Sequence, residues 1–266
     1  MVDFEATKKR QRETWSSGDF SRVATSAVLV GELLCEAVQL HAREKVLDVA
    51  TGSGNTALAA ARRRCEVVGV DYVPALLERA RQRATAEQLV AEFRECDAES
   101  LSFPNHSFDC VLSTFGCMFA PDQERAAAEL DRVCRRGGRI GLACWTPQSF
   151  AGNLFRTVAK HVPPPEGLAP PTRWGTREGL SELFPGGPHI ASELRSVSMR
   201  GDSAESFVEF FRRYFGPTLK AFEALSPADQ PKLQKDLVAE VNRFNRSGDD
   251  TVLIRSEYLE TVITKP

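Results

Sequence analysis

One segment constrains the fold of this chain more than any other, an apolar run followed by closely spaced glycines at residues 45–60. Lys45–Val49 is apolar and β-branched, which predicts a buried strand. Gly52 and Gly54 predict a tight turn in which a ligand approaches the backbone closely and φ can be positive. A helix begins near Asn55, and its free N–H groups suit a carboxylate or a phosphate. The segment therefore predicts a strand–turn–helix unit that binds a ligand.

Short β-rich runs alternate with helical patterns over the first 145 residues. Such alternation predicts an α/β fold, a doubly wound and mostly parallel sheet with helices on both faces. Two later runs complete a seven-stranded sheet and are expected to be antiparallel at its edge. The strands are predicted at residues 45–49, 66–70, 92–95, 108–113, 139–144, 192–199 and 252–263, and the helices at 4–15, 21–40, 74–85, 122–135, 207–215 and 229–245.

The chain is expected to be one domain with three regions. Residues 1–40 are interpreted as an N-terminal helical cap, and residues 41–147 as the ligand-binding core. Residues 148–266 are interpreted as a helical lid and acceptor region together with the final edge strands of the same sheet. Five prolines within Val162–Thr172 indicate an extended connector inside this last region.

The composition limits the kinds of partner. The formal net charge of −2 disfavours a nucleic acid or an anionic membrane. No apolar run approaches the roughly 20 residues needed to span a bilayer, and residues 1–12 lack the apolar stretch of a signal peptide. The seven cysteines are odd in number and form no CxxC pair, which predicts a reducing compartment, no disulfide framework and no metal site. We expect a cytoplasmic monomer or homodimer with a small-molecule partner.

Acidic residues follow three successive predicted strands. Asp48 ends the first strand, Asp71 ends the second and Asp97 follows the third. In this order the three carboxylates suit an ammonium group, a ribose diol and an adenine amino group. The glycine pattern alone also fits a dinucleotide-binding fold, because Asp71 lies 19 residues beyond Gly52.

Taken together, these motifs resemble the class I S-adenosylmethionine-dependent methyltransferases, most closely the branch of quinone-biosynthesis and small-molecule methyltransferases. The resemblance implies a Rossmann-like fold with a helical lid, S-adenosylmethionine as cofactor, and methyl transfer to a small acceptor. The motifs that carry it are Val46–Gly54, Val68–Asp71, Cys96–Pro104, Ser107–Ser113 and Arg132–Gly141.

The family's cofactor contacts carry over to the ends of the first four strands. The resemblance implies that the methionine part lies among Asp48, Thr51, Gly52 and Gly54, the ribose on Asp71, the adenine beside Tyr72, Asp97 and Ala98, and the methionine and acceptor near Ser113, Thr114 and Phe115. One departure is Ala50, where the family more often has glycine. It matters little if φ at residue 50 is ordinary, and it weakens the site if that φ is positive.

The acceptor side carries fewer signals. Methyl transfer needs the acceptor aligned with the methyl group and water excluded, and it needs a general base only if the acceptor keeps its proton. His161 and Tyr214 are the only weak candidates for such a base. Trp15 either closes over the cofactor or anchors a terminal helix, two alternatives that stay open. The aromatic and apolar residues Phe115, Met118, Trp145 and Tyr214 predict a pocket wall for a flat or apolar acceptor.

Three other functions are weighed against this one. A nicotinamide-dependent oxidoreductase is disfavoured because no tyrosine is followed four residues later by lysine. A nucleic-acid methyltransferase is disfavoured because Ser113–Gly116 stands where an Asp/Asn-Pro-Pro-aromatic stretch is common, and because no strong basic patch is present. A non-catalytic cofactor-binding protein on the same fold stays open. Residues 146–266 carry no motif that identifies the acceptor.

Overall fold

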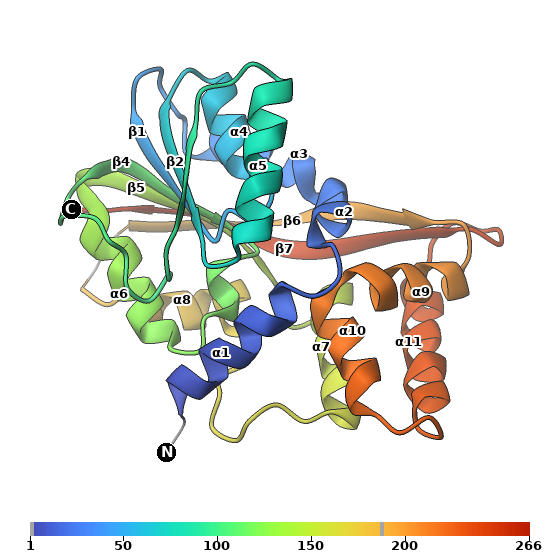
Figure 1. Cartoon of the computed structure of the whole chain (residues 1–266). Coiled ribbons are helices and arrows are strands. Elements are labelled where there is room, and N and C mark those ends of the chain that lie inside the picture. Colours follow the sequence, from blue (N-terminus) through green and yellow to red (C-terminus); the bar gives the residue numbers. More distant parts are fainter. Residues whose placement is uncertain (1–2, 187–188) are drawn as a thin grey trace.

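The computed structural model describes residues 3–186 and 189–266. Its centre is a seven-stranded sheet with the order β3-β2-β1-β4-β5-β7-β6 (Figure 1). The strands are β1 Lys45–Val49, β2 Glu66–Asp71, β3 Glu92–Glu95, β4 Phe108–Thr114, β5 Cys134–Trp145, β6 His189–Gly201 and β7 Val252–Thr264. Strands β1 to β5 pair in parallel, and β7 is antiparallel to both of its neighbours. The predicted fold class is confirmed, with β6 at the sheet edge and β7 inside it.

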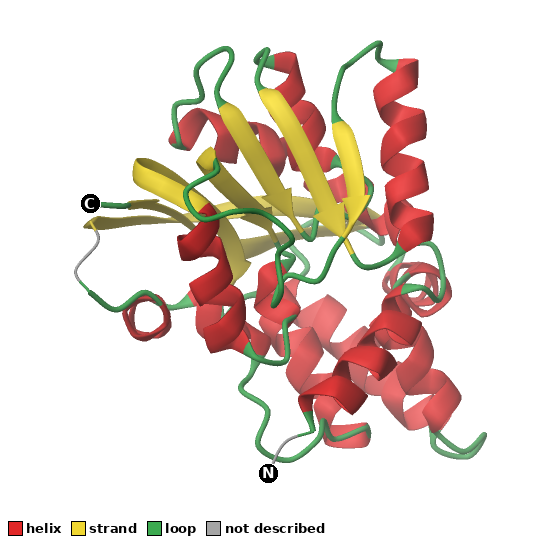
Figure 2. Cartoon of the chain, turned by 60° about the vertical axis from the view of Figure 1, so that its left-hand side comes forward, coloured by secondary structure: helices red, strands yellow, loops and turns green. Residues whose placement is uncertain are grey.

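Helices cover both faces of the sheet (Figure 2). In Figure 1, α3, α4 and α5 lie on one side, and α6 and α8 on the other. The α-helices are α1 Phe4–Trp15, α2 Phe20–Ala24, α3 Val28–Ala37, α4 Asn55–Arg62, α5 Pro74–Ala86, α6 Gln123–Val133, α7 Phe150–His161, α8 Arg177–Leu183, α9 Ala204–Tyr214, α10 Gly216–Ala224 and α11 Gln230–Phe244, and the short 3₁₀ helices are η1 Thr25–Ala27, η2 Cys117–Phe119 and η3 Pro171–Gly175.

The core forms where the sequence is most apolar. Val46, Leu47 and Val49 of β1 are fully buried at the middle of the sheet. Helix α4 follows with four alanines and Leu58 at residues 57–61, all buried, and the small alanines let the helix lie close to the strands. Burial of this apolar surface is the main favourable contribution to folding, and it places the turn after β1 at the carboxyl edge of the sheet.

The helices α7, α9, α10 and α11 form a group near the end of the antiparallel β6–β7 pair at which β6 ends and β7 begins, and α1 lies beside α10 (Figure 1). β7 is paired with β5 only over Tyr258–Thr264, so the first half of β7 extends beyond β5. Within the described part of the chain, every helix is too short or too polar to cross a membrane.

The predicted single helix over residues 21–40 is wrong. The segment is broken into α2, the 3₁₀ helix η1 and α3, with the break at Thr25–Ala27. Thr25 and Ser26 turn their hydroxyls back to the carbonyls of Arg22 and Val23, at 2.7 and 2.9 Å. Hydroxyl side chains that bond to the preceding turn compete with regular helix geometry.

The strand β5 begins five residues earlier than predicted, at Cys134 instead of Arg139. Its pairing with β4 shifts register between Phe108 and Cys110, and Gly137 adopts φ of +68° at this irregularity. The glycine allows extra residues in β5 without steric strain. For this reason residues 134–138, which were predicted as the end of a helix and a turn, belong to the sheet.

Candidate functional site

A cavity of about 650 Å³ opens at the carboxyl ends of the first four strands. It is bounded by the turn after β1, the ends of β2, β3 and β4, and the helices α1 and α2. In α/β sheets of this kind, ligands bind outside the carboxyl ends of the strands. Eleven of the predicted site residues line it, namely Trp15, Asp48, Ala50, Thr51, Gly52, Asp71, Tyr72, Asp97, Ala98, Thr114 and Phe115.

Two predicted contact residues, Gly54 and Ser113, do not line the cavity and instead shape its walls. Gly54 precedes α4 with φ of +85°, and a Cβ added there would lie 3.0 Å from the Cβ of Ala80. Ser113 donates its hydroxyl to the carbonyl of Val49 at 2.8 Å and accepts the N–H of Cys117 at 3.0 Å. Both residues therefore hold the turns after β1 and β4 in place.

Asp48 is a buried carboxylate at the base of the cavity, 1% exposed. It accepts hydrogen bonds from Thr51 Oγ1 at 2.6 Å and from the N–H of Ala57 at 2.9 Å. Burial raises the pKa of Asp48 to about 7, against the opposing effect of these two hydrogen bonds. A buried anion with this pKa is stabilised when a cation binds beside it.

Asp71 ties the glycine turn to the end of β2. Its two carboxylate oxygens accept the N–H groups of Gly52 and Val73, each at 2.9 Å. Burial raises the pKa of Asp71 to about 6, although the backbone hydrogen bonds favour the charged form. Each oxygen retains a further lone pair, so the carboxylate can still accept hydroxyl groups from a ligand.

Helix α1 forms one wall of the cavity and is held there by ion pairs. The ammonium of Lys8 lies 2.9 Å from Asp97 and 3.1 Å from Glu99, and Arg12 pairs with Glu95. The Glu99 side chain is 2% exposed, and burial raises its pKa. The predicted adenine contact Asp97 is therefore already bonded to α1.

The cap region and Trp15 were predicted from the sequence, but the other side chains of α1 that line the cavity were not, although a signal for them was present. Glu5, Lys8, Arg12 and Trp15 recur at spacings of three and four residues, which places them on one face of a helix. All four line the cavity. The pattern identifies the inward face, but it does not identify the acids, which come from the distant strand β3 and the loop after it.

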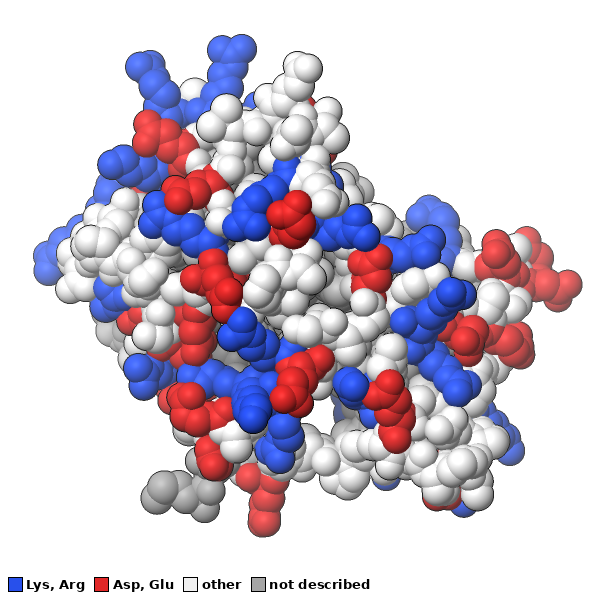
Figure 3. Space-filling view, viewed as in Figure 1, with Lys and Arg blue, Asp and Glu red and all other residues white. Residues whose placement is uncertain are grey.

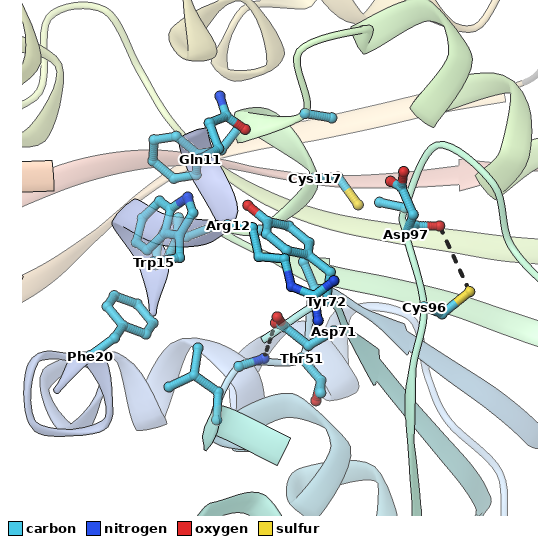
Figure 4. Close-up of a pocket in the computed structure, with 18 of the residues that line it drawn as sticks. Gln11, Arg12, Trp15, Phe20, Thr51, Asp71, Tyr72, Cys96, Asp97 and Cys117 are labelled. Atoms are coloured by element: carbon cyan, nitrogen blue, oxygen red, sulfur yellow. Dashed lines mark hydrogen bonds between the residues drawn. The ribbon is translucent and has the colours of Figure 1, made fainter. Parts of the chain in front are cut away.

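The opposite part of the cavity is aromatic. Trp15 packs edge-on against Phe20, Phe119 and Phe215, with ring centroids 5.4, 5.0 and 5.6 Å apart. Figure 4 shows Trp15 and Phe20 on one side of the cavity and Cys96 and Asp97 on the other. Trp15 thus anchors α1 and lines the cavity at the same time.

The predicted acceptor wall is only partly correct. Phe115 lines the cavity, but Met118 is fully buried. Trp145 stacks behind Phe115 at 3.7 Å. Tyr214 accepts a hydrogen bond from Arg22 at 2.7 Å, outside the cavity. The residues that complete the aromatic part are Phe20 and Phe119, which the sequence did not distinguish from core residues.

The two weak candidates for a general base do not reach the cavity. His161 on α7 pairs with Asp236 on α11 at 2.8 Å, and Tyr214 bonds to Arg22. In the described ranges, 3–186 and 189–266, the residues that line the cavity include no histidine.

Ala50, where the family more often has glycine, has a strained backbone conformation. Both Ala50 and Phe115 have φ of +54°, in the region that favours glycine, and both line the cavity. A Cβ added to Gly116 would lie 2.5 Å from the Cβ of Ala50, so Gly116 makes room for this methyl group. The condition under which alanine weakens the site, a positive φ, is therefore met.

Known proteins similar to this chain include methyltransferases. A family model described as a methyltransferase domain matches residues 47–142. An uncharacterized protein of Mycobacterium tuberculosis is 35% identical over 271 residues, which cover 97% of each chain. The demethylmenaquinone methyltransferase of Deinococcus radiodurans is 37% identical over 167 residues, which cover 60% of this chain and 69% of that protein.

Solved structures share the fold. The crystal structure of the YcgJ protein from Bacillus subtilis superposes with a TM-score of 0.62 at 21% identity, over 88% of this chain and 97% of that one. The methyltransferase model spans nearly all of β1 to β5, the part of the sheet that carries the acidic strand ends. The chain therefore belongs to the class I S-adenosylmethionine-dependent methyltransferases.

Proposed function

We propose that this protein binds S-adenosylmethionine in the cavity at the strand ends and transfers its methyl group to a small, flat or apolar acceptor. Bound there, S-adenosylmethionine supplies an electrophilic methyl group on a sulfonium sulfur. The observation that carries the proposal is the division of one cavity into a part with buried acids and a part with aromatic rings.

The buried acids fit the cofactor. Asp48 has a pKa raised to about 7 because it is buried, and an ammonium beside it would offset this desolvation. Asp71 stands at the end of the next strand with lone pairs available to the two ribose hydroxyls. Tyr72 follows directly and lines the same cavity, where its ring provides a face for the adenine.

The adenine end of the site is shared with helix α1. Asp97 Oδ1 accepts a hydrogen bond from the backbone N–H of Glu99 at 2.9 Å, and Asp97 Oδ2 accepts one from the ammonium group of Lys8 at 2.9 Å. An adenine amino group would bind a carboxylate that α1 already orients. Cofactor binding and the docking of α1 are therefore coupled through one side chain.

The aromatic part suits the acceptor. Trp15, Phe20 and Phe119 surround it with apolar rings, which bind a flat molecule and exclude water from the transfer. The relative from Deinococcus radiodurans is named for methylating demethylmenaquinone. In this proposal the cavity's main part in the transfer is to position the acceptor against the methyl group.

The test is a calorimetric titration with S-adenosylmethionine and S-adenosylhomocysteine on wild type, Asp71→Asn and Asp250→Asn. Asp71→Asn removes the carboxylate that would accept hydrogen bonds from the ribose hydroxyls. Because a hydrogen bond to a charged group is lost, binding of both ligands is expected to weaken at least about tenfold. Asp250 is exposed on the loop before β7 and serves as the control, with binding unchanged. A folded wild type that binds neither ligand contradicts the proposal.

A further inference from the structure

A second hollow lies against the outer side of helix α2. It measures about 640 Å³ and is formed by α2, α5 and α9. Phe20 and Ala24 of α2 line the first cavity, whereas Ser21, Arg22 and Thr25 line this one. The helix thus separates the two spaces. The described residues that line the hollow are Ser21, Arg22, Thr25, Arg79, Gln82, Arg83, Ala86 and Phe210.

Three arginines from two elements converge on this hollow, which we call the arginine groove (Arg22, Arg79, Arg83 and Phe210). Figure 3 shows basic side chains, with acidic ones among them, on the face of the molecule that carries α5 and α9. Within residues 3–186 and 189–266, none of the three lies within 4.0 Å of a carboxylate. Other arginines nearby do find acids.

Arg62 and Arg63 differ from the arginines of the groove because both form ion pairs. Arg62 pairs with Glu32 and Glu87, and Arg63 pairs with Glu32 and Glu36. These guanidinium groups lie among acids that neutralise them. The arginine groove instead gathers three guanidinium groups that form no ion pair within 4.0 Å in the described part of the protein, and Glu87 acts on Arg83 only from a longer distance.

Two of the three guanidinium groups are held in place. Arg22 donates Nη1 to the hydroxyl of Tyr214 at 2.7 Å and lies 4.5 Å from the centre of that ring. Arg83 donates Nη1 to the carbonyl of Ser53 at 2.6 Å and to Asn55 Oδ1 at 2.7 Å. A cation fixed in this way loses little conformational entropy when a ligand binds.

Each guanidinium retains donors for a ligand. Arginine carries five N–H donors, and Arg83 uses only Nη1 in bonds to the described residues. Arg79 donates only Nη1, to Gln82 at 3.2 Å. Burial also lowers the pKa of Arg83, and an anion beside it would reverse this effect. Planar forks of this kind match the oxygens of phosphate and carboxylate groups.

We propose that the arginine groove binds a small anionic ligand through a phosphate or carboxylate group, with an apolar portion of the ligand against Phe210. The ring of Phe210 is half-buried and lines the same hollow, tilted against Tyr214 at 5.1 Å. The site is separate from the cofactor cavity and does not depend on the transfer reaction.

The experiment uses phenyl phosphate, inorganic phosphate and benzoate as probes in calorimetric titrations at low salt. Arg22→Gln/Arg79→Gln removes two charges and leaves Arg83, which also supports Ser53 and Asn55 of the first cavity. The matched control is Arg136→Gln/Arg246→Gln, two exposed arginines whose side chains make no hydrogen bond to the described residues. Thermal melts verify that both double variants are folded.

Wild type is expected to bind phenyl phosphate, and the groove variant to bind it at least about tenfold more weakly, while the control stays within about twofold. Phe210→Ala is expected to weaken the binding of phenyl phosphate and to leave the binding of inorganic phosphate unchanged. Stronger binding of phenyl phosphate than of benzoate identifies a phosphate ligand, and the reverse order a carboxylate. Binding that survives unchanged in Arg22→Gln/Arg79→Gln overturns the proposal, as does a wild type that binds none of the three probes.

Discussion

Ala50 and Gly116 form a pair in which one residue's methyl group occupies the space that the other leaves open. Ala50 holds φ of +54°, where a residue with a Cβ is disfavoured, and its methyl group fills the position a side chain at Gly116 would need. The strain arises from the φ of this one residue and from the contact of its Cβ with Gly116.

Ala50→Gly is expected to stabilise the protein. The left-handed conformation costs alanine about 1–2 kcal/mol, and glycine loses about 0.5–1 kcal/mol of backbone entropy, so the net gain is about 0.5–1 kcal/mol. Chemical denaturation measures the change. Ala120→Gly is the matched control, since Ala120 lines the same cavity with an ordinary φ of −59° and is expected to lose stability. Equal effects of the two substitutions would contradict the role of backbone strain.

At the scale of the element, helix α1 is bound to the core mainly through its side chains. Lys8 reaches Asp97 and the buried Glu99, Arg12 reaches Glu95, and Trp15 packs among aromatic rings. An exposed ion pair contributes little, but removing the partner of a buried carboxylate is costly. Among the ion pairs of α1, those of Lys8 are therefore expected to contribute most to docking the helix.

Lys8→Met is expected to loosen α1 without unfolding the sheet, because Glu99 loses its cation. Hydrogen exchange of the backbone amides of Phe4–Trp15 should become at least about tenfold faster, while the amides of β1 keep their protection. Lys9→Met removes the same charge from the same helix, and Lys9 makes no ion pair with the described residues. If both variants exchange alike, the ion pairs do not hold α1.

At the scale of the whole molecule, two buried carboxylates on adjacent strands reduce the stability of the ligand-free protein as pH rises. Burial raises the pKa of Asp48 to about 7 and of Asp71 to about 6, from ordinary values of 3.8. The unfolded chain releases these protons near pH 4, whereas the folded chain retains them to pH 6–7. Their contribution to stability is present below pH 4 and is lost as pH rises to about 7.

The free energy of unfolding of wild type, relative to Asp48→Asn, is expected to fall by up to about 1.4 kcal/mol per pH unit between pH 4 and pH 7. Chemical denaturation at several pH values measures this difference. The control is Asp250→Asn, which removes an exposed carboxylate and is expected to show no such trend. S-adenosylhomocysteine should reduce the trend if its ammonium binds Asp48. A difference that rises with pH would contradict the raised pKa of Asp48.

The sequence by itself determined the sheet and the acidic strand ends. Strands β1, β2, β3 and β4 were predicted to within one residue. Buried apolar runs limit the boundaries of β1, β2 and β4, whereas β3 buries only Phe93. Asp48, Asp71 and Asp97 reached one cavity because parallel strands end at the same edge. The strand boundaries depend on local sequence, and the meeting of the three acids follows from the parallel arrangement of the strands.

Only the tertiary structure decided what faces the cofactor cavity from outside the strands. Lys8 and Asp97 are 89 residues apart, and no spacing in the sequence relates them. Of the four residues predicted for the acceptor wall, only Tyr214 lies within 148–266, and the described residues of this region support the aromatic part of the cavity from behind, as Phe215 does against Trp15. An aromatic residue that packs in a core and one that lines a cavity have the same local pattern, because burial depends on which distant elements cover them.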